Sequence, residues 1–392
     1  MTDGSRLAPA GALDGVVVAD FSRVLAGPYA TMLLADLGAD VIKVERPGGG
    51  DDTRAWGPPW HDGQATYFLS VNRNKRSVTL DLRDPQGLLA ARTLARRADV
   101  LVENFKPGAF DAMGLGYDDL RADNPGLVYA SITGFGTAGG ADLPGYDLLV
   151  QAVGGLMSMT GSRPDEPVKV GVALVDVVTG LHAAVGILAA LRHREVSGVG
   201  QRIEVNLLSS LLSALVNQSS AFAAAGSVPG IMGNRHPSIA PYESYPTADK
   251  PFVIAVGNDG QFRKAMAVLG LVGVADDERF ATNPARVTNR EALFDLMCER
   301  LRTRAAAEWF HDLSAVGVPC GPINDMAGAF DLATRLGLAP VVDAGGVPTV
   351  ANPLRLSETP PSYRRRPPLL GDATHDVLTD LGLGAMSEEQ PA

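Results

Sequence analysis

Residues 16–44 read VVVADFSRVLAGPYATMLLADLGADVIKV, and this stretch decides the fold. The apolar run over 16–21 predicts a short strand. A helix follows with Pro28 near its first turn and apolar residues at helical spacing, and Gly38 ends it. Residues 39–44 predict a second strand. A strand, a helix and another strand in this order form a βαβ unit, whose two strands run parallel.

The same alternation continues along the first half of the chain. Residues 85–98 predict a helix and 100–102 a strand; after a further helix, 127–133 predict another strand. Two long, weakly polar helical patterns then cover 173–191 and 207–225. Strands that alternate with helices predict an α/β fold, a doubly wound and mostly parallel sheet with helices on both faces.

A stretch rich in proline and glycine, residues 226–251, marks a domain boundary. The pattern restarts beyond it, with a strand at 252–256 and three helical segments at 261–269, 290–302 and 305–316. We therefore expect a large domain over 1–225, a smaller α/β domain over 226–325 and a loop-rich C-terminal segment over 326–392.

Composition limits the classes of function. The 392 residues carry 34 Lys and Arg against 44 Asp and Glu, and this net charge of −10 argues against a general nucleic-acid binder. Residues 43–106 are locally basic, which fits a pocket for a small anion and equally an ordinary solvated surface. The two cysteines, Cys298 and Cys320, predict a reducing compartment, and no spacing suggests a metal site.

The sequence gives no signal of export or membrane insertion. Its first fifteen residues lack a basic segment followed by an apolar one, so we expect no signal peptide. Residues 170–191 are long and apolar enough to raise the question of a membrane helix. Asp176, Thr179 and His182 argue against it, and we expect a cytoplasmic protein that does not bind membranes.

Asp176 is the only formally charged residue between 170 and 191. A lone carboxylate in an apolar segment is costly to desolvate unless it is paired, hydrogen-bonded or protonated. One explanation is chemical, a carboxylate held as a nucleophile. The other is structural, an N-cap for the helix that follows. Spacing alone does not decide between them.

Other motifs are weaker. Residues 134–139 contain a G-x-G-x-x-G pattern after a predicted strand, but no helical pattern follows, which argues against dinucleotide binding. The loop Gly257-Asn258-Asp259-Gly260 could offer backbone N–H groups to a developing negative charge, or could be a plain turn between strand and helix. His182 lies six residues after Asp176, off its helix face, and is interpreted as a packing residue.

Basic residues gather near the ends of the predicted strands. Lys43 and Arg46 lie at the carboxyl end of the second strand, where open parallel sheets bind ligands. The run from Arg73 to Arg76 could hold phosphates through charge-assisted hydrogen bonds. Each could equally be a solvated surface charge. The full set is Lys43, Arg46, Arg54, Arg73, Lys75, Arg76 and Lys106.

Taken in order, several segments resemble the family III coenzyme A (CoA) transferases and their racemase relatives. They span nearly the whole chain and include LDGVVVADFSRVLAGPYATMLLADLGADVIKVERPGGGD, NRNKRSVTLDL, ADVLVENFKPGAFDAMGLGYDDL, PGYDLLVQA, GNRHPSIAPYESYPTAD, VGNDGQF and PPLLGDATHDVLTDLGL. The resemblance implies a doubly wound large domain built from both ends of the chain. It also implies an interlocked homodimer with active sites between subunits.

The resemblance makes Asp176 the nucleophile. Its carboxylate would attack an acyl-CoA thioester to give a mixed anhydride, and CoA would return to form an aspartyl-CoA thioester. The loop with Gly257 and Gly260 would shield these intermediates from water. The racemase relatives have a His in a G-H-D motif where this chain has Tyr146. Tyrosine is a poor base at neutral pH, so Tyr146 favours the transferase branch, where it lines the acyl site.

CoA enters as a substrate, and no permanently bound cofactor is expected. The resemblance places Arg46 and either Lys75 or Arg76 near the phosphates. It places Leu82, Asn104 and Phe105 along the nucleotide groove. The family often has a basic residue where this chain has Ala112, which leaves a phosphate contact at that point open.

We therefore expect a CoA transferase acting on carboxylic acids. Two alternatives stay open, a 2-methylacyl-CoA racemase and a non-catalytic acyl-CoA-binding homologue. Arg235 and His236 suggest dicarboxylates with succinyl-CoA as the donor, but formate, oxalate and carnitine-like acids are equally compatible with the sequence.

Overall fold

The computed structural model describes residues 11–384, which divide into two compact units. The larger unit is built from three pieces of chain, residues 11–156, 170–227 and 339–384. The smaller unit comprises Met157–Lys169 and Val228–Leu338. The sequence pattern had set the limits at 225/226 and 325/326. It gave no sign that the short segment 157–169 packs with the smaller unit.

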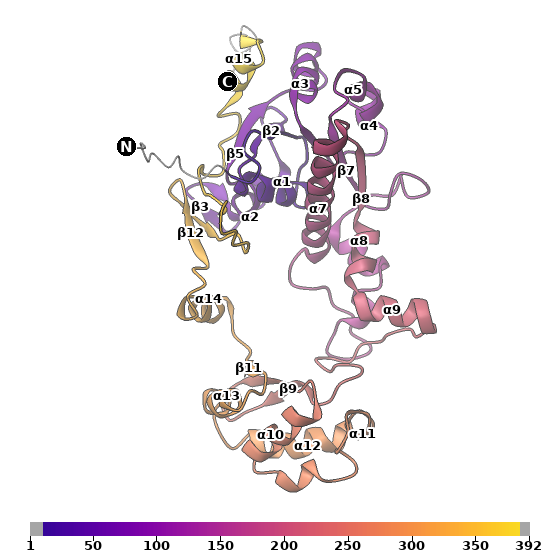
Figure 1. Cartoon of the computed structure of the whole chain (residues 1–392), viewed down its shortest axis with the longest axis vertical. Coiled ribbons are helices and arrows are strands. Elements are labelled where there is room, and N and C mark those ends of the chain that lie inside the picture. Colours follow the sequence, from indigo (N-terminus) through magenta and orange to yellow (C-terminus); the bar gives the residue numbers. More distant parts are fainter. Residues whose placement is uncertain (1–10, 385–392) are drawn as a thin grey trace. The chain divides into compact units, whose positions relative to one another are not determined.

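The larger unit is organised around a six-stranded, fully parallel sheet in the order β5-β2-β1-β6-β7-β8 (Figure 1). Its strands are β1 (Val17–Asp20), β2 (Asp40–Glu45), β5 (Lys75–Thr79), β6 (Val100–Glu103), β7 (Val128–Thr133) and β8 (Arg202–Asn206). β8 was not predicted, because charged and polar residues interrupt its apolar pattern.

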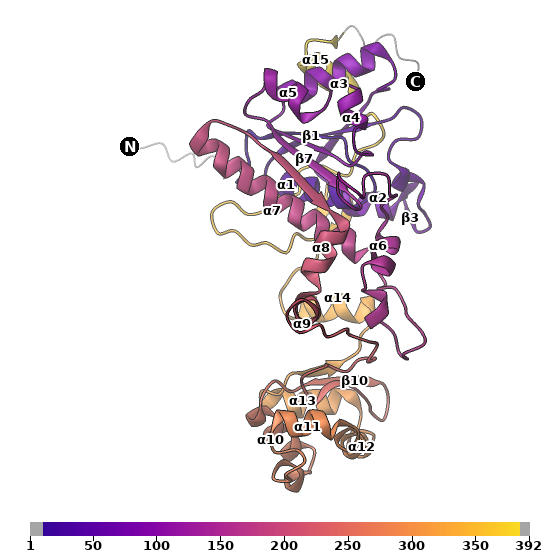
Figure 2. The same ribbon diagram turned by 90° about the vertical axis from the view of Figure 1, so that its right-hand side faces the viewer.

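Both faces of the sheet are covered, which confirms the doubly wound α/β fold. Along β6, Val100 and Val102 enter one hydrophobic core while Leu101 enters the other. Strands buried on both sides read as continuous apolar runs, and this explains the sequence of 100–102. One face carries α1 (Ala26–Asp36), α7 (Leu174–Ser197) and α8 (Leu207–Ala214). The other carries α3 (Pro85–Arg97), α5 (Tyr117–Asp123) and α15 (Thr374–Asp380) (Figures 1 and 2).

The C-terminal segment completes the larger unit beside β5. The backbone N–H of Ala373 donates to the carbonyl of Ser77, and the N–H of Gly371 donates to the Ser77 hydroxyl. Short elements fill the rest of this unit: β3 (Trp60–His61), β4 (Gln64–Ala65), α2 (Thr66–Val71), α4 (Ala109–Ala112), α6 (Asp147–Val153), β12 (Val341–Ala344) and β13 (Val347–Val350), with a 3-10 turn at Asp52–Ala55.

One of the expected helices is divided in the structure. The pattern over 207–225 is two helices, α8 and α9 (Val216–Ala225), bent by 88° at Leu215. Within the described residues, α7 has the length and the mean hydropathy (2.0) of a membrane span, and the bent pair α8 and α9 would meet the same test together. However, Val175, Ala183 and Ile187 of α7 lie in the core against the sheet, so α7 serves as a core helix.

The smaller unit pairs an antiparallel sheet, in the order β11-β10-β9, with a group of helices. The strands are β9 (Tyr242–Pro246), β10 (Pro251–Ala255) and β11 (Cys320–Pro322). The helices are α10 (Asp259–Val268), α11 (Asn283–Thr288), α12 (Arg290–Leu301), α13 (Ala306–Ala315) and α14 (Met326–Arg335), with 3-10 turns at Met157–Met159 and Val272–Ala275. Phe252, Phe262 and Met297 are central to its own hydrophobic core.

Candidate active site

Asp176 is the third residue of α7, in its first turn, and it does not cap the helix. The N-cap is Ala173, and no side chain of α7 itself supplies a cap hydrogen bond. Asp147, the first residue of α6, takes this role instead. Its Oδ2 accepts hydrogen bonds from the backbone N–H groups of Val175 (2.8 Å) and Asp176 (3.2 Å). The structure therefore excludes the cap explanation for Asp176.

The environment of Asp176 favours the protonated acid. Burial raises the pKa of its carboxyl group to about 7, and the nearby negative charge of Asp147 adds to the shift. Within residues 11–384, no hydrogen bond or ion pair reaches its carboxylate oxygens. A carboxylate that is weakly solvated and unpaired is a good nucleophile once it ionises.

Asp176 opens into a cavity of about 340 Å³ in the larger unit. Tyr146, which precedes α6 and is 62% exposed, lines the same cavity. The remaining lining comes from loops at the carboxyl ends of the strands, where parallel sheets bind ligands. These residues include Arg23, Val24, Leu25, Ala26, Asn104, Phe105, Lys106, Pro107, Thr133, Gly134, Gly136, Pro144 and Leu207.

A second cavity of about 340 Å³ adjoins the first, and Arg23 and Phe105 line both. Of the six predicted CoA-binding residues, Arg46, Leu82 and Phe105 line the second cavity, and Asn104 lines the first. The Asn104 side chain holds the backbone of Arg23, which lines both cavities. Its Oδ1 accepts from the Arg23 N–H (3.0 Å), and its Nδ2 donates to the Arg23 carbonyl (2.8 Å).

Lys75 and Arg76 line neither of these cavities. Lys75 is completely buried, and its ammonium donates to Asp20 (3.1 Å), to the Pro28 carbonyl and to Asn72. Arg76 pairs with Asp40. Both charges are paired with carboxylates of the same unit, and the expected contact of one of them with a CoA phosphate stays a prediction.

Arg73 likewise does not face a ligand. Its guanidinium lies inside the larger unit, 2.6 Å from Asp36 Oδ2. The run from Arg73 to Arg76 is therefore structural. Its sequence looked like a phosphate loop because the partner carboxylates lie more than thirty residues away.

Three residues near the cavities were missed by the sequence reasoning. Arg23 and Arg83 line the second cavity, and each comes shortly after a strand, a position that could have signalled them. Tyr67 has no such signal. Burial together with the charges of Asp176 and Asp147 raises its pKa to about 12, which places its phenol within electrostatic range of both carboxylates.

The glycine loop belongs to the smaller unit. Asn258 caps α10 by accepting from the Gln261 N–H, and Gln261 Oε1 accepts from the Gly257 N–H (2.8 Å). Gly257 and Gly260 both have ordinary negative-φ backbone. A Cβ at Gly257 would meet only Gln261 Oε1 at 3.4 Å. The fold of this unit does not itself require glycine at 257.

Arg235, which was suggested to bind dicarboxylate substrates, already forms ion pairs within the smaller unit. Its guanidinium pairs with Glu243 at 3.0 Å and also with Glu291. His236 packs against Tyr242, with ring centroids 5.2 Å apart. His182 of α7 bonds to the hydroxyl of Ser210, at 3.1 Å, consistent with a packing residue.

Comparison with known proteins identifies the chain. The profile of CoA-transferase family III matches residues 13–374. The chain belongs to this family. The predicted resemblance, the transferase class and the expectation of acyl-CoA substrates are thereby confirmed.

Relatives of this family III enzyme align over most of their length. It is 44% identical to a succinate–glutarate CoA-transferase of Agrobacterium fabrum, covering 94% of this chain and 95% of the relative. It is 42% identical to the human succinyl-CoA:glutarate CoA-transferase, covering 94% and 86%. A crystal structure of a CAIB/BAIF family protein from Brucella suis superposes with a TM-score of 0.85 at 44% identity, covering 95% of this chain and all of that one.

Proposed function

We propose that the enzyme transfers CoA between carboxylic acids with Asp176 as the covalent nucleophile. The observation that carries this proposal is the unpaired carboxylate of Asp176 in a cavity that shares Arg23 and Phe105 with a second cavity. One cavity is suited to the reacting acyl group. The other is suited to the nucleotide of CoA.

The reaction is proposed to proceed through four acyl exchanges. The Asp176 carboxylate attacks the thioester carbonyl of the donor, the C–S bond breaks, and CoA leaves as a thiolate from a mixed anhydride. The thiolate attacks the Asp176 carbonyl and expels the donor acid, which leaves an aspartyl-CoA thioester. The acceptor carboxylate then attacks this thioester and releases CoA thiolate. The thiolate finally attacks the acceptor carbonyl, which restores Asp176. No proton is consumed overall.

For CoA itself, we propose that the second cavity holds the nucleotide. Phe105 offers an aromatic face, Leu82 an apolar wall and Arg46 a guanidinium. Arg46 is exposed and pairs with Asp52 at 2.6 Å, so this exposed pair must open when a phosphate replaces the carboxylate. Arg23 and Arg83, which line the same cavity, add positive charge toward the phosphates.

We propose dicarboxylates as the acceptor class. The relatives from Agrobacterium and human are named for succinate and glutarate, and a 39% identical relative from Haloarcula hispanica is a succinyl-CoA:mesaconate CoA-transferase. Arg23 and Lys106 bring positive charge to the cavity that contains Asp176. Lys106 pairs with the exposed Asp142, a weak interaction that a substrate carboxylate can displace.

A homodimer is proposed from an uncovered apolar surface. Leu181, Val185 and Leu188 of α7 are 42%, 65% and 37% exposed, and Phe222 of α9 is 59% exposed. Three exposed apolar side chains at helical spacing along α7 are typical of a protein interface. A cytoplasmic location is proposed with it, because both cysteines are free.

Gly257 and Gly260 are proposed, in keeping with the family resemblance, to shield the covalent intermediates from water. Gly257→Ala should leave the smaller unit folded, since the added Cβ has room there. The expected result is a higher ratio of acyl-CoA hydrolysis to CoA transfer. An unchanged ratio would remove Gly257 from the proposal.

The decisive experiment traps the intermediate. Enzyme incubated with succinyl-CoA and treated with borohydride or hydroxylamine should carry a modification on the peptide that contains Asp176, and Asp176→Ala should carry none. The variant should still bind CoA. Deuterium exchange at the α-carbon of a 2-methylacyl-CoA, without CoA transfer, would instead support racemisation. CoA binding with neither reaction would indicate a non-catalytic homologue.

A further inference from the structure

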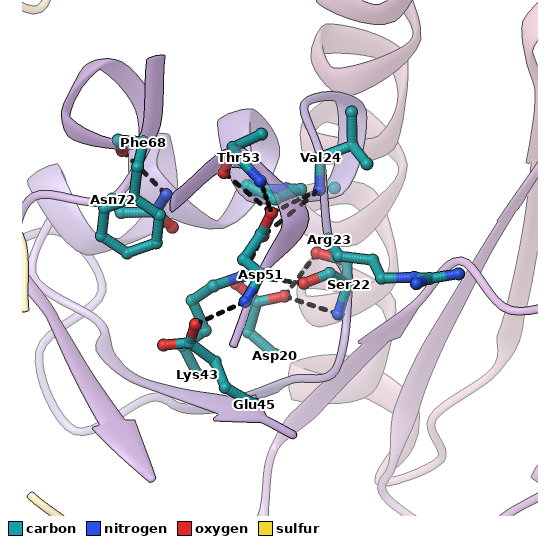
Figure 3. A network of polar contacts seen from close by, with 12 residues as sticks. Asp20, Ser22, Arg23, Val24, Lys43, Glu45, Asp51, Thr53, Phe68 and Asn72 are labelled. Atoms are coloured by element: carbon teal, nitrogen blue, oxygen red, sulfur yellow. Dashed lines mark hydrogen bonds and ion pairs between the residues drawn. The ribbon is translucent and has the colours of Figure 1, made fainter. Parts of the chain in front are cut away.

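A network of buried charges surrounds the turn from Ser22 to Val24, whose Arg23 lines both cavities (Figure 3). Lys43 and Asp51 are both fully desolvated at the side chain, and their ion pair is 2.9 Å long. The same Lys43 ammonium donates to the Ser22 carbonyl at 2.9 Å. Asp20 Oδ1 accepts hydrogen bonds from the backbone N–H and the hydroxyl of Ser22.

Asp51 also holds the backbone of Val24, the residue after Arg23. Both of its carboxylate oxygens accept from the Val24 N–H, at 3.2 and 3.3 Å (Figure 3). Val24 has φ 72°, in the left-handed region. A β-branched residue rarely adopts this conformation, and it persists only where its surroundings impose it. Lys43 and Asp51 together supply that constraint.

The strained turn determines which groups face each cavity. Arg23, before the turn, lines both cavities and exchanges two hydrogen bonds with Asn104. Leu25 and Ala26, after the turn, line the cavity of Asp176, and α1 begins at Ala26. A different φ at Val24 would redirect the chain on one side of the turn relative to the other.

We propose that Lys43 and Asp51 are positioning residues for CoA transfer, which act by holding the backbone of Val24 in its left-handed conformation. Both residues line the second cavity, but their side chains are fully buried in their own ion pair, so neither is assigned a catalytic role. This inference rests on the proposed function. Lys43 and the Thr53 N–H outweigh the effect of burial and lower the pKa of Asp51 to about 2, so the pair stays charged at every working pH.

The chain offers a matched control for a buried ion pair. Asp36 and Arg73 are as deeply buried as Asp51 and Lys43 and are 2.6 Å apart, but neither lines either cavity. Asp36→Asn and Asp51→Asn thus remove one buried charge each. A purely structural role for Asp51 predicts the same kinetics for both variants once they are compared below their melting temperatures.

The test measures kcat/KM for transfer from succinyl-CoA and the Kd for CoA in four variants. These are Asp51→Asn, Asp36→Asn, Val24→Gly and the double variant of Asp51 and Val24. We expect Asp51→Asn to lose about tenfold or more in kcat/KM and Asp36→Asn less than about threefold. Glycine adopts positive φ without strain, so the further loss caused by Asp51→Asn in the Val24→Gly background should fall to about threefold or less.

Each result decides one question. Equal losses from Asp51→Asn in both backgrounds, or equal kinetics for the two Asp→Asn variants, would overturn the positioning role while the wild type still transfers CoA. Absence of transfer and of Asp176 labelling in the wild type would instead overturn the proposed function. If Asp51→Asn does not fold, Thr53→Val replaces it, because this change removes only the hydroxyl that donates to Asp51 at 2.8 Å. Unchanged kinetics in that variant would also overturn the proposal.

Discussion

Replacing the proposed nucleophile should make the protein more stable, and more so at pH 8 than at pH 5. Asp176 is partly buried without a bonding partner for its carboxylate, and burial raises its pKa to about 7. A carboxyl group whose pKa is higher in the folded state favours folding least when it is ionised. Its penalty is absent at pH values below the unfolded pKa of about 4, grows as the pH rises, and is complete above pH 7.

The size of the effect follows from the shift. A change from 3.8 to about 7 corresponds to about 4 kcal/mol at 1.36 kcal/mol for each pKa unit. We take about 2 kcal/mol, since water still reaches part of the Asp176 side chain and the first turn of α7 favours an anion through its dipole. For a unit of this size, about 2 kcal/mol raises the Tm by about 4–8 °C.

The assay compares the Tm of wild type and Asp176→Asn by calorimetry at pH 5 and pH 8. We expect the variant to melt higher at pH 8 and the difference to shrink at pH 5. Asp142→Asn, which removes an exposed carboxylate lining the same cavity, is the control and should show no such pH dependence. A variant that is destabilised equally at both pH values would refute the reasoning.

Three further outcomes are expected. In kcat/KM profiles the rate should rise through about pH 7 as Asp176 ionises, and Asp147→Asn should move this rise to lower pH because it removes a neighbouring negative charge. Arg46→Met should weaken CoA binding in calorimetric titration by about tenfold, the value of one charge-assisted hydrogen bond. Asp36→Ala should lower the free energy of unfolding in urea by about 3 kcal/mol, since Arg73 stays buried without its carboxylate.

Each of these has a control of its own. Asp165→Asn removes an exposed carboxylate of the smaller unit and should leave the pH profile in place. Arg121→Met breaks an exposed pair with Asp118 that lines neither cavity, and CoA affinity should not change. If Arg73→Met combined with Asp36→Ala is no more stable than Asp36→Ala alone, the unpaired charge is not the cause of the loss.

The sheet could be predicted from the sequence, but the ion-pair partners of its charged side chains could not. Apolar runs such as 100–102 and 127–133 have one interpretation once helices alternate with them, since each must be buried on both faces. The family resemblance placed Lys75 or Arg76 near the phosphates of CoA, but Lys75 is buried in the structure. Its partner, Asp20, lies on a strand 55 residues earlier, and no local pattern connects the two.

The same limit applies to the site. The apolar run singled out Asp176, and Tyr146 was identified from one motif. The hydrogen bonds from the first turn of α7 to Asp147 span 28 and 29 residues. They exclude the N-cap explanation of Asp176, and no local sequence pattern predicts them. The bend at Leu215 had no signal either, because neither glycine nor proline marks it.

The three-piece construction of the larger unit has a consequence for how the chain folds during synthesis. Asn74 receives its partners from the C-terminal segment, since its Oδ1 accepts from the N–H groups of Arg364 and Arg365. Residues 339–384 leave the ribosome only after the entire smaller unit has been made. The edge strand β5 is therefore uncovered while some 260 residues are translated, at about 5–20 residues per second. During this time its backbone can pair with other chains. Misassembly can therefore begin at this edge during synthesis, and chaperones that hold nascent chains are expected to act there.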